Sequence, residues 1–200
     1  MGQRIIVWDD ELDTEFHKKN ENFNFKFHGN FDIKNIKNTV SNFNDEWKIN
    51  TYRQEAYSVH QNTQSYTIFD VSNEWVASDP YLVVKKSNNE DLINLIMPII
   101  NKLEEIHEGR VGKVLFIDLP PIKDVLPHTD KRDYLNMARR HHIPIITNDN
   151  VNFYVNGESI NMKEGECWEI NNSLMHSVDN QGNTNRIHLM IDIMPEKFLK

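Results

Sequence analysis

The 200-residue chain has little of several features that mark whole classes of protein. Its single cysteine, Cys167, excludes a disulfide within the chain and favours a reducing compartment. No apolar run approaches the roughly 20 residues that a membrane-spanning helix needs. The first residues, from Met1 to Arg4, lack the apolar core of a signal peptide. We therefore expect a soluble cytoplasmic protein with no membrane partner.

Basic blocks are missing as well. The formal net charge is −8, and no stretch is rich in Lys and Arg. Nucleic-acid-binding proteins usually carry a positively charged surface patch, so we expect no nucleic-acid partner. With 38% hydrophobic residues, the chain is suited to bury a sizeable core as one domain over residues 1–200. Its oligomeric state is unknown from the sequence.

One helix is clearly predicted, over residues 90–108. Leucine and isoleucine recur there at three- and four-residue spacing, which makes an apolar stripe. Asn88 or Asn89 is placed to cap its start, and Gly109 to end it. Pro98 lies inside the stripe and predicts a kink or a restart. We expect this helix to pack against the outside of a sheet.

Short β-strands account for most of the remaining pattern, above all after residue 112. They are expected at residues 5–8, 66–69, 81–84, 113–117, 140–147, 151–155, 167–170, 174–178 and 186–193. Asn156-Gly157 is a strong hairpin signal, and Gln181-Gly182-Asn183 marks another turn. Such spacing predicts a mainly β protein with flanking helices and a double-stranded β-helix core of the jelly-roll or cupin-like kind.

The two halves of the chain differ in how much chemistry they display. Residues 1–110 are predicted to supply flanking helices and strands, and residues 111–195 the β-helix core with the metal site. In the first half, Arg53, Tyr57 and His60 belong to no motif. We interpret them as surface residues, or as core residues whose hydrogen bonds are made within the protein, rather than as substrate-facing residues.

The candidate site begins with His128-Thr129-Asp130. His176 follows 46 residues after Asp130, and Arg186 lies ten residues further on. A His-x-Asp tripeptide is expected about once by chance in a chain of this composition. The evidence for a metal site therefore comes from the tripeptide together with His176 and Arg186. Two imidazoles and one carboxylate leave positions open on a metal, an arrangement that suits non-haem Fe(II) oxygenases.

Arg186 adds a cation to this pattern. The two-residue alternation of a strand places it on one face with His188 and Met190, while the intervening residues face the other way. A guanidinium is well suited to bind a carboxylate through two parallel hydrogen bonds. The turn near Gln181 lies midway between His176 and Arg186. When the chain reverses there, the two residues come to a similar position along their strands. Whether their strands pair directly or face each other across two sheets stays open.

Five blocks of sequence extend the pattern beyond its metal ligands. In order, they are Leu126-Pro127-His128-Thr129-Asp130, Arg140-His141-His142-Ile143-Pro144-Ile145, Gly165-Glu166-Cys167-Trp168-Glu169-Ile170-Asn171-Asn172, His176-Ser177-Val178-Asp179-Asn180 and Arg186-Ile187-His188-Leu189. By these blocks, residues 112–194 resemble the aspartyl/asparaginyl β-hydroxylase-like Fe(II)/2-oxoglutarate-dependent oxygenases, which include bacterial proline hydroxylases.

The resemblance implies a role for each matching residue. Fe(II) would be held by His128, Asp130 and His176, and the distal carboxylate of 2-oxoglutarate by Arg186. Arg140 and His142 lie on one strand face and would add charge or donors for the cosubstrate or a substrate carboxylate, while Arg139 and His141 should face away. Some relatives have Gly in place of Asp130, so the carboxylate here favours a three-ligand site of the proline-hydroxylase type.

Three function classes follow. The leading prediction is a dioxygenase that uses Fe(II), 2-oxoglutarate and O2 to hydroxylate an aliphatic C–H of a prolyl or aspartyl/asparaginyl side chain. Its partner would be an amino-acid, peptide or protein substrate. A cupin-like module that binds metal or ligand without oxidation is the second class, against which Arg186 argues, since metal binding alone needs no matched cation. An oxygenase of a lipid or other small metabolite is the third.

Overall fold

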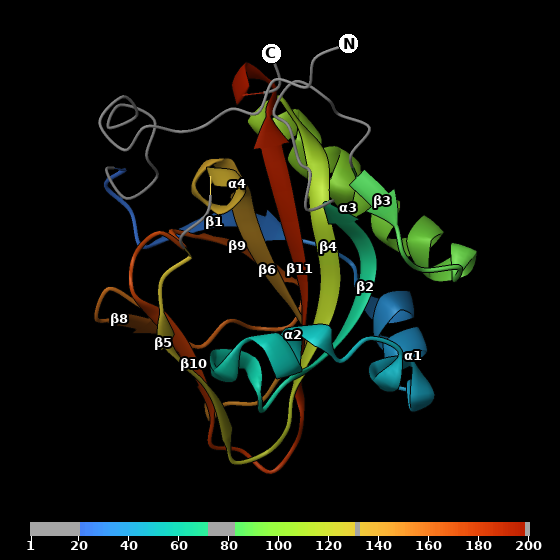
Figure 1. The fold of residues 1–200 in the computed structure, drawn as a ribbon, viewed down its shortest axis with the longest axis vertical. Helices are drawn as coiled ribbons and strands as arrows, with labels where there is room; N and C mark the ends of the chain where they lie inside the picture. Colours follow the sequence, from blue (N-terminus) through green and yellow to red (C-terminus); the bar gives the residue numbers. More distant parts are fainter. Residues whose placement is uncertain (1–20, 72–82, 131–132, 199–200) are drawn as a thin grey trace.

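The computed structural model describes residues 21–71, 83–130 and 133–198, so the strand expected at residues 5–8 lies outside it. Within these ranges two antiparallel sheets face each other (Figure 1). The larger sheet has the order β1 (Phe25–Asn30), β9 (Glu166–Ile170), β6 (Arg139–Ile146), β11 (Arg186–Pro195), β4 (Gly109–Leu119), β2 (Gln64–Val71) and β3 (Val83–Lys85). The smaller sheet has the order β5 (Lys123–His128), β10 (His176–Asn180), β7 (Val151–Val155) and β8 (Glu158–Ile160). This is the predicted mainly β, jelly-roll arrangement.

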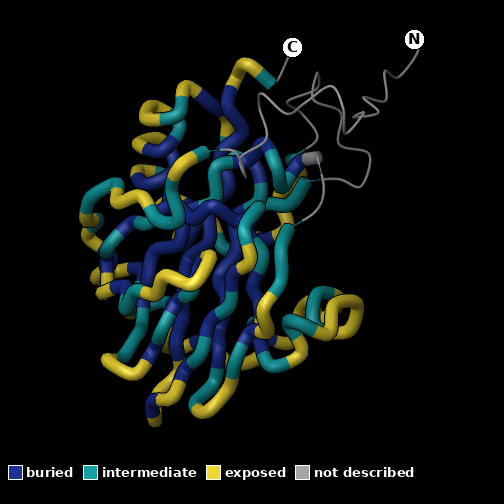
Figure 2. Tube along the Cα trace, turned by 90° about the vertical axis from the view of Figure 1, so that its left-hand side faces the viewer, coloured by how far each residue is buried: buried dark blue, intermediate teal, exposed yellow. Residues whose placement is uncertain are grey.

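Strand β11 forms the middle of the larger sheet, between β6 and β4, and every one of its residues is buried. Ile187, Leu189 and Ile191 belong to the core on the helix side of the sheet. Arg186 and Met190 face the smaller sheet, as the alternation predicted. Figure 2 shows the same pattern for the molecule, with buried strands inside and exposed residues mainly at turns and ends.

Helix α3 (Glu90–His107) packs on the outer face of the larger sheet, beside α1 (Lys34–Val40) (Figure 1). The Asn89 side chain caps it by accepting from the backbone N–H of Leu92 at 3.0 Å. The helix runs on through Pro98 without a restart. Its end differs from the prediction, because Glu108 (φ 45°) takes the left-handed position and Gly109 already belongs to β4.

Three strands were not predicted, namely β1, β5 and β8. The β1 segment does carry a strand signal that the prediction missed, because Phe23, Phe25 and Phe27 alternate with polar residues, whereas β5 shows no such alternation and ends in Pro127-His128. Both are recruited by pairing with distant strands, β1 with β9 and β5 with β10. The hairpin at Asn156-Gly157 is confirmed, since it joins β7 to β8 with φ of 50° and 82°.

The turn at residues 181–183 joins β10 of the smaller sheet to β11 of the larger one. His176 and Arg186 therefore face each other across two sheets and their strands do not pair. Two short helices, α2 (Tyr52–Ala56) and α4 (Asp133–Met137), lie close to the open side of the sandwich (Figure 1). Among the described residues no helix has the length and apolarity to cross a membrane.

Candidate metal and cosubstrate site

His128 and His176 lie directly opposite each other at adjacent ends of β5 and β10, with ring centroids 4.2 Å apart. Each ring is oriented by its own backbone. Nδ1 of His128 donates to the carbonyl of Leu126 at 2.7 Å, and Nδ1 of His176 donates to the carbonyl of Leu174 at 2.9 Å. Because a carbonyl only accepts, both protons sit on Nδ1, and each Nε2 keeps its lone pair for a metal.

Asp130 completes the group, with one ligand atom from each of His128, Asp130 and His176 within 4.8 Å of one another. Its Oδ2 accepts from Asn172 Nδ2 at 2.8 Å and from Arg140 Nη1 at 2.5 Å. Its Oδ1 accepts no hydrogen bond from the described part of the chain, so one oxygen is left for a metal. The carboxylate is therefore both oriented and available.

The charge states of these ligands suit a divalent metal. Burial alone would raise the pKa of Asp130, but the charge of Arg140, with smaller contributions from His176 and the Asn172 hydrogen bond, outweighs it and holds that pKa well below its usual range. Burial lowers the pKa of His176 to about 4, so its imidazole is neutral near pH 7. Metal ligands must be deprotonated, and two imidazoles with one carboxylate fit Fe(II) with open positions.

Arg186 is 2% exposed and faces the pocket between the two sheets, hereafter the intersheet pocket. Burial and the charge of Arg53 lower its pKa to about 9. Its Nη2 donates to Nδ1 of His188 at 2.7 Å, while its Nε is buried without a partner. Among the described residues no carboxylate forms an ion pair with Arg186. Since an unpaired buried cation is costly, this position favours an anionic ligand.

Two more unpartnered polar atoms lie beside Arg186. Because Arg186 donates to Nδ1 of His188, the proton of that imidazole sits on Nε2, which is buried without an acceptor. Nδ1 of His142 is likewise buried without a partner, and its ring lies 5.9 Å from that of His188. Phe153 covers the guanidinium of Arg186 at 5.7 Å. A cation with nearby polar atoms left unpaired fits the carboxylate end of 2-oxoglutarate.

Arg140 lines the intersheet pocket but already binds two carboxylates. Its Nε and Nη2 donate to the two oxygens of Asp192, each at 2.8 Å, and its Nη1 donates to Asp130. A direct role for Arg140 in cosubstrate binding stays a prediction. The side chains of β6 point as predicted. Arg140 and His142 line the pocket. Arg139 and His141 contact residues on the opposite face of the sheet.

Arg53 and His60 also line the intersheet pocket, together with His128 and Arg186. Arg53 donates to Thr63 Oγ1 at 3.2 Å and contacts His60 Nε2 at 3.1 Å. Our interpretation of these two residues as surface or satisfied core is therefore incomplete. They come from α2 and the segment after it, where no motif or period distinguishes them in the sequence.

The comparisons with known proteins agree with this geometry. Residues 30–195 match the family described as Aspartyl/Asparaginyl beta-hydroxylase. No curated protein matches the sequence.

Among solved structures, a viral collagen prolyl hydroxylase from Paramecium bursaria Chlorella virus-1, in complex with 2-oxoglutarate, is similar in fold. It shares 10% identity, with a TM-score of 0.50 over 87% of this chain and 97% of that one. An oxidoreductase of the 2OG-Fe(II) oxygenase family from Burkholderia pseudomallei shares 12% identity, with a TM-score of 0.51 over 66% and 67% of the two chains. At these identities the likeness concerns the fold. The family match covers most of the sequence, and the chain belongs to the aspartyl/asparaginyl β-hydroxylase family.

Proposed function

We propose that this chain is an Fe(II)- and 2-oxoglutarate-dependent dioxygenase that hydroxylates an aliphatic C–H of an amino-acid side chain, prolyl or aspartyl/asparaginyl. The observation that carries the proposal is the buried, unpaired guanidinium of Arg186 in the same pocket as His128 and His176. A module that only binds metal has no need of that cation, and leaving it buried costs stability.

Each residue has a defined part in this function. His128, Asp130 and His176 hold the metal through the atoms that their hydrogen bonds leave available. Arg186 binds the distal carboxylate of 2-oxoglutarate, and His142 and His188 offer polar atoms beside it. The bound iron and 2-oxoglutarate supply the oxidation of the C–H bond with O2.

The chain's own contribution is placement and exclusion of water. Apolar side chains from both sheets line the pocket around the polar groups, namely Ile117, Val125, Phe153, Val178 and Met190. Such walls strengthen each electrostatic contact inside and limit side reactions with water.

Arg53 supports a substrate that carries a carboxylate. Among the described residues it forms no ion pair, and it reaches the pocket from α2, on a different element from Arg186. With Arg186 assigned to 2-oxoglutarate, a second unpaired guanidinium is left for the substrate. A free amino acid offers its α-carboxylate, and an aspartyl side chain offers a carboxylate within a polypeptide.

The test is turnover with a defined panel. Protein loaded anaerobically with Fe(II) is given 2-oxoglutarate and air with free amino acids, short peptides or lysate protein. Succinate and a product heavier by one oxygen atom are then measured by mass spectrometry. We expect both with an amino-acid or peptide substrate, and neither above background in a matched His176→Ala preparation.

Two results would contradict parts of the proposal. Succinate at the level of the His176→Ala control with every substrate, in protein that binds metal and 2-oxoglutarate, would indicate a binding module. Hydroxylation confined to fatty-acyl or nucleoside substrates would keep the dioxygenase and overturn the substrate class.

A further inference from the structure

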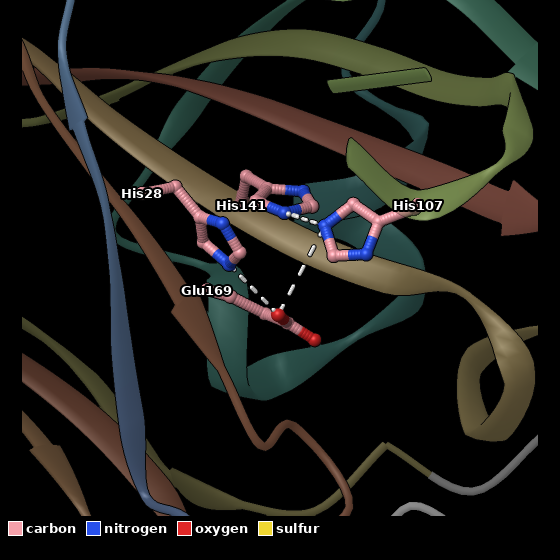
Figure 3. Close-up of side chains that lie close together, drawn as sticks. All are labelled: His28, His107, His141 and Glu169. Carbon is pink, nitrogen blue, oxygen red and sulfur yellow. Dashed lines mark hydrogen bonds and ion pairs between the residues drawn. The ribbon is translucent and has the colours of Figure 1, made fainter. Parts of the chain in front are cut away.

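The histidines of this chain fall into two groups. Of the nine in the sequence, His17 lies outside the described residues. Five contact or line the intersheet pocket: His60, His128, His142, His176 and His188. The other three, His28, His107 and His141, converge with Glu169 on the opposite face of the larger sheet (Figure 3).

Four separate elements bring this second group together. His28 comes from β1, His141 from β6 and Glu169 from β9, which are neighbouring strands, while His107 is the last residue of α3 (Figure 3). Strand alternation explains the separation from the first site, because adjacent residues of β6 point His142 into the intersheet pocket and His141 away from it. The two groups thus lie on opposite sides of the larger sheet.

The side chains of this group point at one another. One ligand atom from each of the four residues lies within 4.8 Å of all the others. The measured pairs are His107 Nε2 to His141 Nε2 at 2.8 Å, His28 Nε2 to Glu169 Oε2 at 3.0 Å and His107 Nε2 to Glu169 Oε2 at 4.0 Å. Tetrahedral Zn²⁺ with bonds of about 2.0–2.1 Å places its ligand atoms roughly 3.3 Å apart, so small adjustments would complete this geometry.

Neighbouring groups orient these side chains as they do in metal sites. Nδ1 of His141 donates to the carbonyl of Ile191 at 3.2 Å, which leaves the lone pair on Nε2 directed at the group. Arg139 donates to Oε1 of Glu169 at 3.3 Å, which leaves Oε2 toward the imidazoles. Hydrogen bonds of this kind fix the tautomer of a ligating histidine and the rotamer of a ligating carboxylate.

Burial keeps His107 and His141 neutral, while the groups around Glu169 keep it charged. A bound cation would displace the Nε2 protons with which His28 and His107 now donate to Glu169 and His141. The exposed fraction of the Glu169 side chain is 1%, and that of His107 is 9%. Burial lowers the pKa of His107 to about 4 and that of His141 to about 3, so both are neutral near pH 7. Burial alone would raise the pKa of Glu169, but the hydrogen bond from His28 and the nearby His141 and Arg139 lower it to about 2.

We propose that His28, His107, His141 and Glu169 form a second metal site, which binds Zn²⁺ and has a structural role separate from the iron site. Four protein ligands fill a tetrahedral shell and leave no open position for a substrate, as in structural zinc sites. The ion would tie the end of α3 to three strands of the larger sheet. A surface pocket of about 330 Å³ lined by His107, Arg139 and Glu196 offers a path for the ion.

The test uses full-length protein without a histidine tag, in which the iron site has been removed by His128→Ala and His176→Ala. After dialysis against a chelator, this double variant is titrated with Zn²⁺ by calorimetry and with Co²⁺ by visible absorption. We expect one bound ion, the d–d bands of a tetrahedral site, and a higher Tm with Zn²⁺. The wild-type protein is expected to bind two ions.

Ligand removal then assigns the ion to the group. In the double-variant background, His107→Gln is expected to weaken Zn²⁺ binding ~10-fold or more and to cancel the rise in Tm. His107 is the most accessible ligand and lies at a helix end, so circular dichroism should show a folded protein. Glu169→Gln, which keeps the shape of the side chain, is the second variant. Glu105→Gln on the same helix, an exposed carboxylate paired with Lys102, is the matched control and should bind like its parent.

The site is refuted if the double variant binds no ion at chelator-buffered Zn²⁺, or binds Co²⁺ without tetrahedral bands. It is also refuted if folded His107→Gln and Glu169→Gln both bind Zn²⁺ as tightly as their parent. The four residues would then form a hydrogen-bond network alone. None of these outcomes bears on the dioxygenase, because each is observed in protein that lacks both proposed iron-ligating histidines.

Discussion

Arg140 joins Asp130 to Asp192 across the inner face of the larger sheet. Its Nη1 donates to the oxygen of Asp130 that also accepts from Asn172, and its Nε and Nη2 bind Asp192, whose side chain is fully buried. The guanidinium therefore orients the carboxylate that we propose as a metal ligand while it balances two buried carboxylates. Under the proposed function, Arg140 would act on the metal through Asp130.

The first prediction concerns that ion pair. Arg140→Gln leaves Asp192 buried without its cation, and breaking a buried pair of this kind costs about 3–5 kcal/mol in the free energy of unfolding. With Asp130 less well oriented, Fe(II) affinity should also fall ~10- to 100-fold. Urea denaturation and Fe(II) titration measure the two effects. Arg110→Gln, whose ion pair with Glu196 is largely exposed, is the control and should change neither. Near-normal stability and iron affinity in Arg140→Gln would contradict the orienting role.

The second prediction concerns the iron ligands. His128→Ala and His176→Ala should each abolish Fe(II) binding and turnover without loss of the fold, because each removes one of the two imidazole ligands and leaves a single nitrogen ligand for the metal. Asp130→Ala is the milder change, since some relatives have Gly there. Asp179→Asn is the control, because Asp179 lies on the same strand as His176 but bonds to Asn152 and Tyr154. Near-normal iron affinity in either histidine variant would show that the assignment is wrong.

The third prediction concerns Arg186. Arg186→Lys keeps the charge but loses the planar fork, and a charge-assisted hydrogen bond contributes roughly 1.5–3 kcal/mol, so 2-oxoglutarate affinity should fall ~10-fold or more. The readout is the shift of Tm by 2-oxoglutarate in Mn²⁺-loaded protein, which needs no turnover. The shift should be smaller in Arg186→Lys and absent in Arg186→Ala. An unchanged shift in Arg186→Ala would mean that another residue holds the distal carboxylate.

The fourth prediction separates Arg53 from Arg186. Arg53→Gln removes a cation that we assign to the substrate carboxylate, so kcat/KM for an amino-acid substrate should fall ~10-fold or more, mainly through KM. The Tm shift caused by 2-oxoglutarate should persist, because Arg186 is intact. Substrate kinetics and thermal shifts on the same preparation measure both. Loss of the 2-oxoglutarate shift with an unchanged substrate KM would exchange the roles of the two arginines.

The sequence by itself determined the features that local periodicity and turn chemistry encode. The apolar stripe predicted α3, Asn156-Gly157 predicted its hairpin, and two-residue alternation placed Arg186 with Met190 and Arg140 with His142. Each of these follows from residues within one turn or one strand. The spacing of His128, Asp130 and His176 also predicted a group that the structure brings together.

Only the tertiary structure decided the features that depend on contacts between distant segments. β5 shows no clear period and forms because β10 offers an edge to pair with. Arg53 reaches the intersheet pocket because α2 packs near its mouth, and His28 meets Glu169 across 141 residues of sequence. Such contacts form when the two sheets and α3 bury their apolar faces together, and no local pattern records which polar side chains that packing brings into contact.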